Sequence, residues 1–183
     1  MLICTLIVIT TLTANAQTAA NTPPAETPVK WYTLEEAQAL SAKAPRKIFV
    51  DMYTSWCGWC KVMDKNTFSQ PEIAQYLNTY FYPVKFDGEG KEPVVFNGQT
   101  FNYNPDYRCH ELAAAIMQGN MSYPTTVYIN EQMQLLTLVP GYLLPDDLLP
   151  ILVFFAQDYF QKMSWPDFQQ QWPQIKETMQ KKK

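Results

Sequence analysis

A pair of cysteines separated by two residues constrains this chain more than any other feature. Cys57 and Cys60 follow the apolar run 48–53, so the pair lies where a buried strand gives way to a helix. Two cysteines at this spacing can close a small disulfide in the first helical turn, where free backbone N–H groups and the helix dipole stabilise a thiolate. We therefore expect Cys57 to be the exposed attacking sulfur and Cys60 the sheltered sulfur that resolves a mixed disulfide.

Two other uses of the cysteine pair have to be weighed. A structural disulfide that closes so short a loop removes little chain entropy and stabilises poorly. A zinc site would have to recruit Cys109 and His110, but adjacent residues on a helix point in different directions. The sequence therefore favours redox chemistry and indicates neither a metal nor another cofactor. We expect Cys109 to be a small packed residue, not a third redox thiol or an intermolecular link, and His110 to be a helix-surface or hydrogen-bonded residue.

Composition sets the scale of the fold. The chain has 183 residues, 47% of them hydrophobic, which is enough for one ordinary globular core and short for two. A formal net charge of −3 provides no basic surface field, which argues against nucleic acid as a main partner. The sequence thus indicates one globular domain, which we expect to act as a monomer.

The N-terminus has the pattern of an export signal. Residues 2–12 are apolar and uncharged, and Ala14-Asn15-Ala16 provides the small-x-small pattern of a cleavage site, although no Lys or Arg precedes the apolar run. A membrane anchor is the rival interpretation, but this run is shorter than the roughly 20 apolar residues that span a bilayer. We interpret residues 1–16 as a signal peptide and residues 17–29 as a flexible leader of a periplasmic or otherwise exported protein.

Apolar periodicity and turn residues predict the order α, β, α, β, insertion, α, β, β, α, α. The predicted helices cover residues 33–42, 57–77 with a break near Pro71, 110–118, 146–161 and 165–180. The predicted strands cover residues 48–53, 81–86, 125–129 and 134–139, the last two as an antiparallel hairpin. This order indicates an α/β fold with a mixed central sheet covered by helices on both faces.

Residues 88–108 interrupt the pattern with glycines and prolines, so we expect an insertion with a small hairpin around Asn97-Gly98. The predicted domain then covers residues 30–162, and residues 163–183 form a C-terminal helical extension.

Several residues around the cysteine pair resemble the thioredoxin superfamily. An acid lies six positions before the first cysteine in that family, as Asp51 does here. Lys85 on the next strand matches the family's lysine that faces this acid, and Tyr123-Pro124 before the hairpin matches its cis-proline loop. The active-site helix, with its Thr-Phe-x-x-Pro-like end at residues 67–71, is similar to the C-terminal domain of DsbD-type electron transporters. The likeness covers roughly residues 31–160 and implies a thioredoxin-like fold with the insertion before the cis-proline loop.

The resemblance also implies roles for the residues that carry it. A carboxylate on an apolar strand is costly to bury unless it is paired or protonated, and the family context assigns Asp51 to proton transfer with Cys60, tuned by Lys85. The alternative for Asp51 is an ordinary salt bridge at a strand edge. Pro124, with Tyr123 before it, would shape the ledge that receives a partner's backbone, although a plain turn proline remains an alternative.

Aromatic and glycine residues near the motif complete the expected binding surface. Trp56 and Trp59 are expected to expose an apolar rim for protein substrates, and core packing of one of them is an equal alternative. Gly58-Trp59 replaces the Gly-Pro of typical thioredoxins, so the redox potential does not transfer. Gly141 would leave room for a partner or would serve only as a turn residue.

The resulting hypothesis is an exported thiol-disulfide oxidoreductase that acts as a reductant or electron relay. Its expected partners are protein thiols and disulfides and an unidentified redox partner, for which a membrane electron donor is one candidate. The alternatives are a disulfide oxidase or isomerase of the same fold, and a non-catalytic binding module that uses the tryptophans and the insertion.

Overall fold

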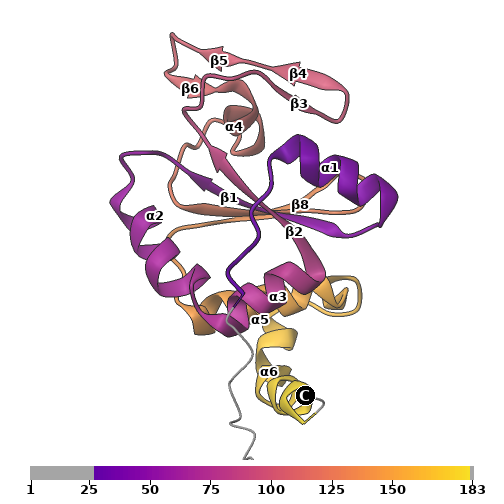
Figure 1. Ribbon diagram of the computed structural model, residues 1–183. Helices are drawn as coiled ribbons and strands as arrows, with labels where there is room; N and C mark the ends of the chain where they lie inside the picture. The colour runs from indigo at the N-terminus through magenta and orange to yellow at the C-terminus, as the bar shows by residue number, and fades with distance from the viewer. Residues whose placement is uncertain (1–26, 182–183) are drawn as a thin grey trace, which may run out of the picture.

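The computed structural model describes residues 27–181 (Figure 1). The expected signal peptide and the first part of the expected leader lie outside these residues. A four-stranded sheet at the centre has the order β2 (Phe81–Asp87), β1 (Lys47–Tyr53), β7 (Thr125–Ile129), β8 (Leu135–Pro140). Strands β1 and β2 are parallel, whereas β7 is antiparallel to both β1 and β8. The predicted mixed sheet and terminal hairpin are confirmed.

Helices cover both faces of this sheet, as the sequence predicted. On β1, Ile48, Val50 and Met52 pack against α1 (Leu34–Lys43) and α4 (Glu111–Ile116). Phe49 points to the opposite face, as alternation along a strand requires. That face carries α2 (Gly58–Met63), α3 (Pro71–Tyr80) and α5 (Pro145–Ala156). Asp51 shares the parity of Phe49 and therefore lies under the helix that carries the cysteine pair.

Local signals set the helix boundaries. Thr33 and Glu36 form a capping box at the start of α1, each side chain bonding the other residue's backbone N–H. Pro71 occupies the first turn of α3, where a missing N–H costs nothing, so the predicted break is confirmed. Between α2 and α3 the chain forms one turn of π-helix, η1 (Asp64–Phe68), a feature often found at functional sites.

The insertion is more structured than a long loop. Strands β3 (Val94–Phe96) and β4 (Gln99–Phe101) pair around Asn97 and Gly98, both at positive φ, which confirms the predicted hairpin. A second ladder joins β5 (Tyr103–Asn104) to β6 (Cys109–His110). The predicted helix from residue 110 was therefore wrong at its start, because Nδ1 of His110 accepts the Leu112 N–H and caps α4 from outside.

The C-terminal part differs from prediction at one turn. Helix α5 ends at Ala156 because Asp158 adopts a left-handed conformation with φ 55°, after which a 3₁₀ turn, η2 (Tyr159–Gln161), follows. Helix α6 (Trp165–Gln180) has its predicted bounds, and its Phe168 is fully buried in the same core as α3 and α5. Within residues 27–181, no helix is both long and apolar enough to cross a membrane.

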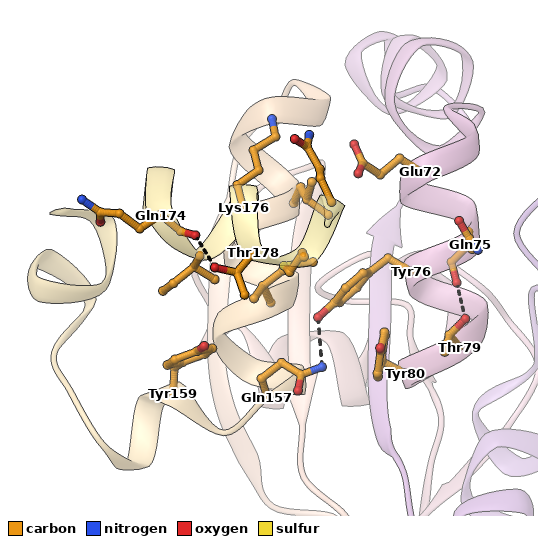
Figure 2. A pocket seen from close by; sticks show the side chains of 15 residues that line it. Glu72, Gln75, Tyr76, Thr79, Tyr80, Gln157, Tyr159, Gln174, Lys176 and Thr178 are labelled. Atoms are coloured by element: carbon orange, nitrogen blue, oxygen red, sulfur yellow. Dashed lines mark hydrogen bonds between the residues drawn. The ribbon is translucent and has the colours of Figure 1, made fainter. Parts of the chain in front are cut away.

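A cavity of about 590 Å³ lies between α3, α5 and α6 (Figure 2). Tyr76 projects into it from α3, and its hydroxyl accepts a hydrogen bond of 3.4 Å from Nε2 of Gln157. Glutamine, tyrosine and apolar side chains make up most of the lining, which contains none of the residues of the cysteine site. The chemistry suggested by the sequence is therefore located elsewhere.

Candidate active site

The cysteine pair lies where strand β1 gives way to α2. Cys57 is the N-cap of α2, and its Sγ accepts a hydrogen bond of 3.1 Å from the backbone N–H of Cys60. The two residues form a disulfide, as expected. The expectation that Cys57 is exposed was wrong for this state, since Cys57 is 4% and Cys60 3% exposed. A sulfur that is part of a disulfide is not a thiolate, so attack by Cys57 requires the reduced form.

The exposed surface beside the disulfide belongs to the two tryptophans. Trp56 is 64% and Trp59 62% exposed, so neither is a core residue. The Trp59 ring packs against the Tyr142 ring at a centroid distance of 5.4 Å. Their exposure excludes core packing of either side chain, and their contact with protein substrates stays a prediction.

The insertion supports one of these tryptophans. Nε1 of Trp56 donates a hydrogen bond of 2.9 Å to Oε2 of Glu89, and its ring meets Tyr123 edge-on at 6.2 Å. A bond to a carboxylate is stronger than one between neutral groups, so it restrains an otherwise mobile side chain. Sequence reasoning missed Glu89, because only the fold brings a residue 33 positions away to Trp56.

Asp51 and Lys85 meet as the resemblance predicted. They are direct neighbours in the parallel register of β1 and β2, and Nζ of Lys85 lies 2.8 Å from Oδ2 of Asp51. The Asp51 side chain is 1% exposed, and within the described residues neither of its oxygens has a well-aligned hydrogen bond. The contact is therefore an ion pair that a buried carboxylate depends on.

Lys85 is also held from its other sides. Its ammonium group forms a second ion pair with Asp64, the first residue of the π-helical turn. It lies 5.1 Å from the ring centroids of Trp31 and Tyr53 and 5.5 Å from that of Phe68. Such distances allow cation–π attraction. The sequence assigned no role to Asp64 or Trp31, although both lie within the stretch that carries the resemblance, because only the fold brings them to Lys85.

The ionisation of this cluster follows from burial and pairing. Burial raises the pKa of Asp51 to about 6, against the lowering effect of Lys85, and the nearby Asp64 adds to the rise. Burial alone would lower the pKa of Lys85, but the two carboxylates outweigh it and the pKa is raised. Asp51 can therefore gain or lose a proton near neutral pH while Lys85 stays charged.

The predicted proline loop is confirmed in its geometry. The Tyr123–Pro124 peptide bond is cis, and the carbonyl oxygen of Pro124 accepts a hydrogen bond of 2.8 Å from the backbone of Gly141. Gly141 has φ +100°, a conformation that favours glycine, so the turn itself requires this residue. The Tyr123 hydroxyl packs over Gly88, where a side chain would overlap it.

Cys109 and His110 do not join the site chemistry. Cys109 is a free, buried thiol, as expected, and burial followed by the carboxylate of Glu89 raises its pKa. His110 is 1% exposed and both of its ring nitrogens form hydrogen bonds, so of the two environments expected for it the hydrogen-bonded one is confirmed. Within residues 27–181, no three His, Cys, Asp or Glu side chains are grouped so that they could hold a metal ion.

A mixed four-stranded sheet, a disulfide at the N-terminus of a helix, a buried Asp–Lys pair and a cis-proline loop define a protein with a thioredoxin fold. A sequence model of one family matches residues 14–183, and its description reads "Thioredox_DsbH: Protein of unknown function, DUF255". The chain therefore belongs to this family.

The chain is also similar in sequence to parts of two longer curated proteins. One is "Uncharacterized protein B0495.5" of Caenorhabditis elegans, with 28% identity over 131 residues. This stretch covers 71% of the present chain and 16% of the relative. The other is "Thiol:disulfide interchange protein DsbD" of Haemophilus ducreyi, with 38% identity over 68 residues. This stretch covers 34% of the present chain and 12% of the relative. The chain thus spans 16% or less of the length of these curated relatives.

A solved structure supports the fold. The structure "DsbH Oxidoreductase" aligns with 78% of this chain and 94% of its own length, with a TM-score of 0.53 and 17% identity. At this identity the likeness shows a shared thioredoxin fold.

Proposed function

We propose that the protein is an exported thiol-disulfide oxidoreductase that exchanges disulfides with other proteins through Cys57 and Cys60. The observation that carries the proposal is the Cys57–Cys60 disulfide at the start of α2, on the sheet face that holds the buried Asp51–Lys85 ion pair. A structural staple has no need of a buried carboxylate that titrates near neutral pH, whereas thiol exchange has to move protons. The names of the DsbH and DsbD relatives point the same way.

The first step of the proposed reaction is attack on a substrate disulfide. The Cys57 thiolate, stabilised by backbone N–H groups at the start of α2, attacks one sulfur of the substrate. A Cys57–substrate disulfide forms, the substrate S–S bond breaks, and the second substrate sulfur leaves as a thiolate. The N–H of Cys60, which donates to Cys57 Sγ at 3.1 Å, supports negative charge on this sulfur.

The second step resolves the mixed disulfide. Cys60 loses its thiol proton to the Asp51 carboxylate, directly or through water, and its thiolate attacks Sγ of Cys57. The Cys57–Cys60 disulfide forms, and the remaining substrate sulfur leaves as a thiolate that takes up a proton. Two electrons have then passed from the protein dithiol to the substrate, and a dithiol donor must restore the reduced form.

Lys85 and the groove beside it serve the return of the proton. Lys85 holds the charged form of Asp51, and it also borders an open groove of about 440 Å³ next to residues 90–94 of the insertion. Solvent can therefore reach Lys85 from this side, and we assign the release of the Asp51 proton between turnovers to the Lys85 side of the ion pair.

The roles assigned to the surrounding surface belong to the same proposal. Trp56 and Trp59 would receive apolar side chains of a protein substrate, supported by their exposure of more than 60% each. Tyr123, Pro124 and Gly141 would form the ledge for its backbone, with Gly58 leaving the motif accessible. Export rests on the apolar segment 2–12 and on the sequence likeness to DsbD.

Insulin reduction tests the activity. The wild-type protein with dithiothreitol should accelerate precipitation of the insulin B chain, and Cys57→Ser should abolish this acceleration. Cys60→Ser should instead accumulate a mixed disulfide visible by mass spectrometry. Activity retained in Cys57→Ser would refute the assignment.

The reduction potential tests the direction of exchange. A potential near about −270 mV supports a reductant or relay, whereas one near about −120 mV supports the oxidase alternative. The absence of any reversible couple would support the binding module instead.

A further inference from the structure

The segment that precedes α1 lies across the Asp51–Lys85 site. In Figure 1 this indigo segment runs from α3 past the sheet toward α1. Asn78 of α3 holds it from one side, accepting from Lys30 N at 2.8 Å and donating to Pro28 O at 2.9 Å. Tyr32 holds it from the other side, since its N–H donates to Pro83 O at 2.9 Å and its backbone forms a parallel bridge with Val84. Trp31, between these anchors, has a defined position.

Trp31 uses this position to pack over the lysine. Its ring contacts Phe68 edge-on at 5.1 Å and Phe49 at 6.5 Å, so it extends the aromatic core toward β2. Lys85 Nζ lies 5.1 Å from the Trp31 ring centroid. Indole attracts a cation over its face more strongly than the other aromatic rings do. The cation–π attraction between Lys85 and Trp31 is strengthened because the Lys85 side chain is only 21% exposed and therefore largely shielded from water.

The charged groups around Lys85 come from three elements. Strand β1 supplies the Asp51 carboxylate and the Tyr53 ring, and η1 supplies Asp64. Strand β2 supplies Asp87, whose charge acts on Tyr53. Lys85 has two carboxylates to choose from, one fully buried and one 46% exposed. Contact with the buried Asp51 costs Lys85 more of its hydration than contact with the exposed Asp64 does, so a neighbouring group that attracts the ammonium group favours the Asp51 contact.

We infer that Trp31 is a positioning residue of the proton-transfer site, and that its indole keeps the Lys85 ammonium group against Asp51. This inference rests on the proposed function for its catalytic meaning. Without the ring, Lys85 shifts toward Asp64 and solvent, and Asp51 loses part of its counter-charge while other residues keep it buried. The charged form of Asp51 then becomes less favourable, and its titration moves to higher pH.

Titration of the full chain tests the inference without relying on activity. The Asp51 carboxyl signal is followed by carbon-13 NMR in oxidised protein, in which Cys57 and Cys60 do not titrate, and assigned by its loss in Asp51→Asn. In Trp31→Leu, which retains apolar bulk, the midpoint should rise by about half a pH unit or more. Trp31→Phe should restore most of the wild-type value, since it keeps an aromatic face.

Trp172→Leu is the matched control. Trp172 is also a partly buried tryptophan, but it packs against Phe168 on α6, so its loss should leave the Asp51 midpoint unchanged. A wild-type midpoint in Trp31→Leu, or an equal shift in Trp172→Leu, would overturn the inference.

The pH profile of insulin reduction gives the catalytic readout. Its acidic limb should move upward in Trp31→Leu by the same amount as the carboxyl titration. A limb that stays in place while the titration moves would overturn the catalytic part of the inference. A wild-type protein that reduces no disulfide, yet shows the shift by NMR, would refute the proposed function and leave the position of Lys85 supported.

Discussion

Lys85 lies 2.8 Å from the buried carboxylate of Asp51, and the parallel register of β1 and β2 makes the two residues direct neighbours. The ion pair is unequal in its surroundings, because Asp51 is 1% exposed while Lys85 is 21% exposed and reaches a second carboxylate. A charge on Asp51 is therefore expensive and depends on one partner. We therefore expect the ionisation of Asp51 and its pairing with Lys85 to set the pH dependence of both stability and activity.

Replacing Asp51 with asparagine should stabilise the protein at neutral pH. The folded pKa is raised from 3.8 to about 6, so the unfolded chain loses its proton first and stability falls as the pH rises through this window. A shift of about two units corresponds to roughly 3 kcal/mol as an upper figure. Urea unfolding of oxidised Asp51→Asn should show a gain of about 1–3 kcal/mol at pH 7.5 and almost none at pH 3.5.

Asp64→Asn is the control for this experiment. Asp64 is 46% exposed, so its charge carries little desolvation cost, and its loss should change stability by less than about 1 kcal/mol. An Asp51→Asn gain of the same size at both pH values would show that the effect does not come from ionisation.

Removing the cation of Lys85 should move the activity profile. In Lys85→Met the buried Asp51 loses its nearest positive charge, so its pKa rises further above the value of about 6. Less of the carboxylate is then available as a base at pH 7, and insulin reduction should slow by on the order of tenfold or more. The rate should recover at higher pH. Lys85→Arg, which keeps the positive charge, should lose less of the insulin reduction rate than Lys85→Met. A wild-type pH profile of insulin reduction in Lys85→Met would contradict the proposed proton transfer.

Adding a methyl group at Gly88 should disturb the proline loop. A Cβ there would overlap the Tyr123 hydroxyl and lie 2.6 Å from its Cζ atom, so the tyrosine has to move. Gly88→Ala should cost about 1–3 kcal/mol by chemical denaturation, as overpacking does in other cores. Gly58→Ala is the control, because nothing lies within 4 Å of its Cβ position and alanine favours a helix by up to about 1 kcal/mol. Equal stabilities for the two variants would contradict the close packing of Tyr123 on Gly88.

Truncation of Phe168 should show whether α6 belongs to the core. Phe168 is fully buried and contacts Phe154 at a centroid distance of 5.0 Å. Phe168→Ala should cost about 3–5 kcal/mol and lower the melting temperature, measured by circular dichroism. Gln170→Ala, at an exposed position of the same helix, should be nearly neutral. Wild-type melting of Phe168→Ala would show that residues 163–183 are a separable extension.

Much of the fold could be predicted because it depends on short-range patterns. The capping box at Thr33 and Glu36, the break at Pro71 and the hairpin at Asn97-Gly98 are each encoded within a few residues. The central strands are short apolar runs with β-branched and aromatic residues, a pattern typical of buried strands. The sequence left two environments open for His110, a helix surface and a hydrogen-bonded position, because the long-range contacts of its ring with Phe86 and the backbone of Glu92 decide between them.

The sequence by itself determined the cysteine pair, its place between strand and helix, and the acid and lysine that accompany it. Only the tertiary structure decided that the closed disulfide is buried, that Glu89 supports Trp56, and that Trp31 covers Lys85. The physical reason is distance along the chain. Periodicity and turn chemistry act between neighbouring residues, whereas a contact between residues 31 and 85 exists only after the sheet and helices have packed.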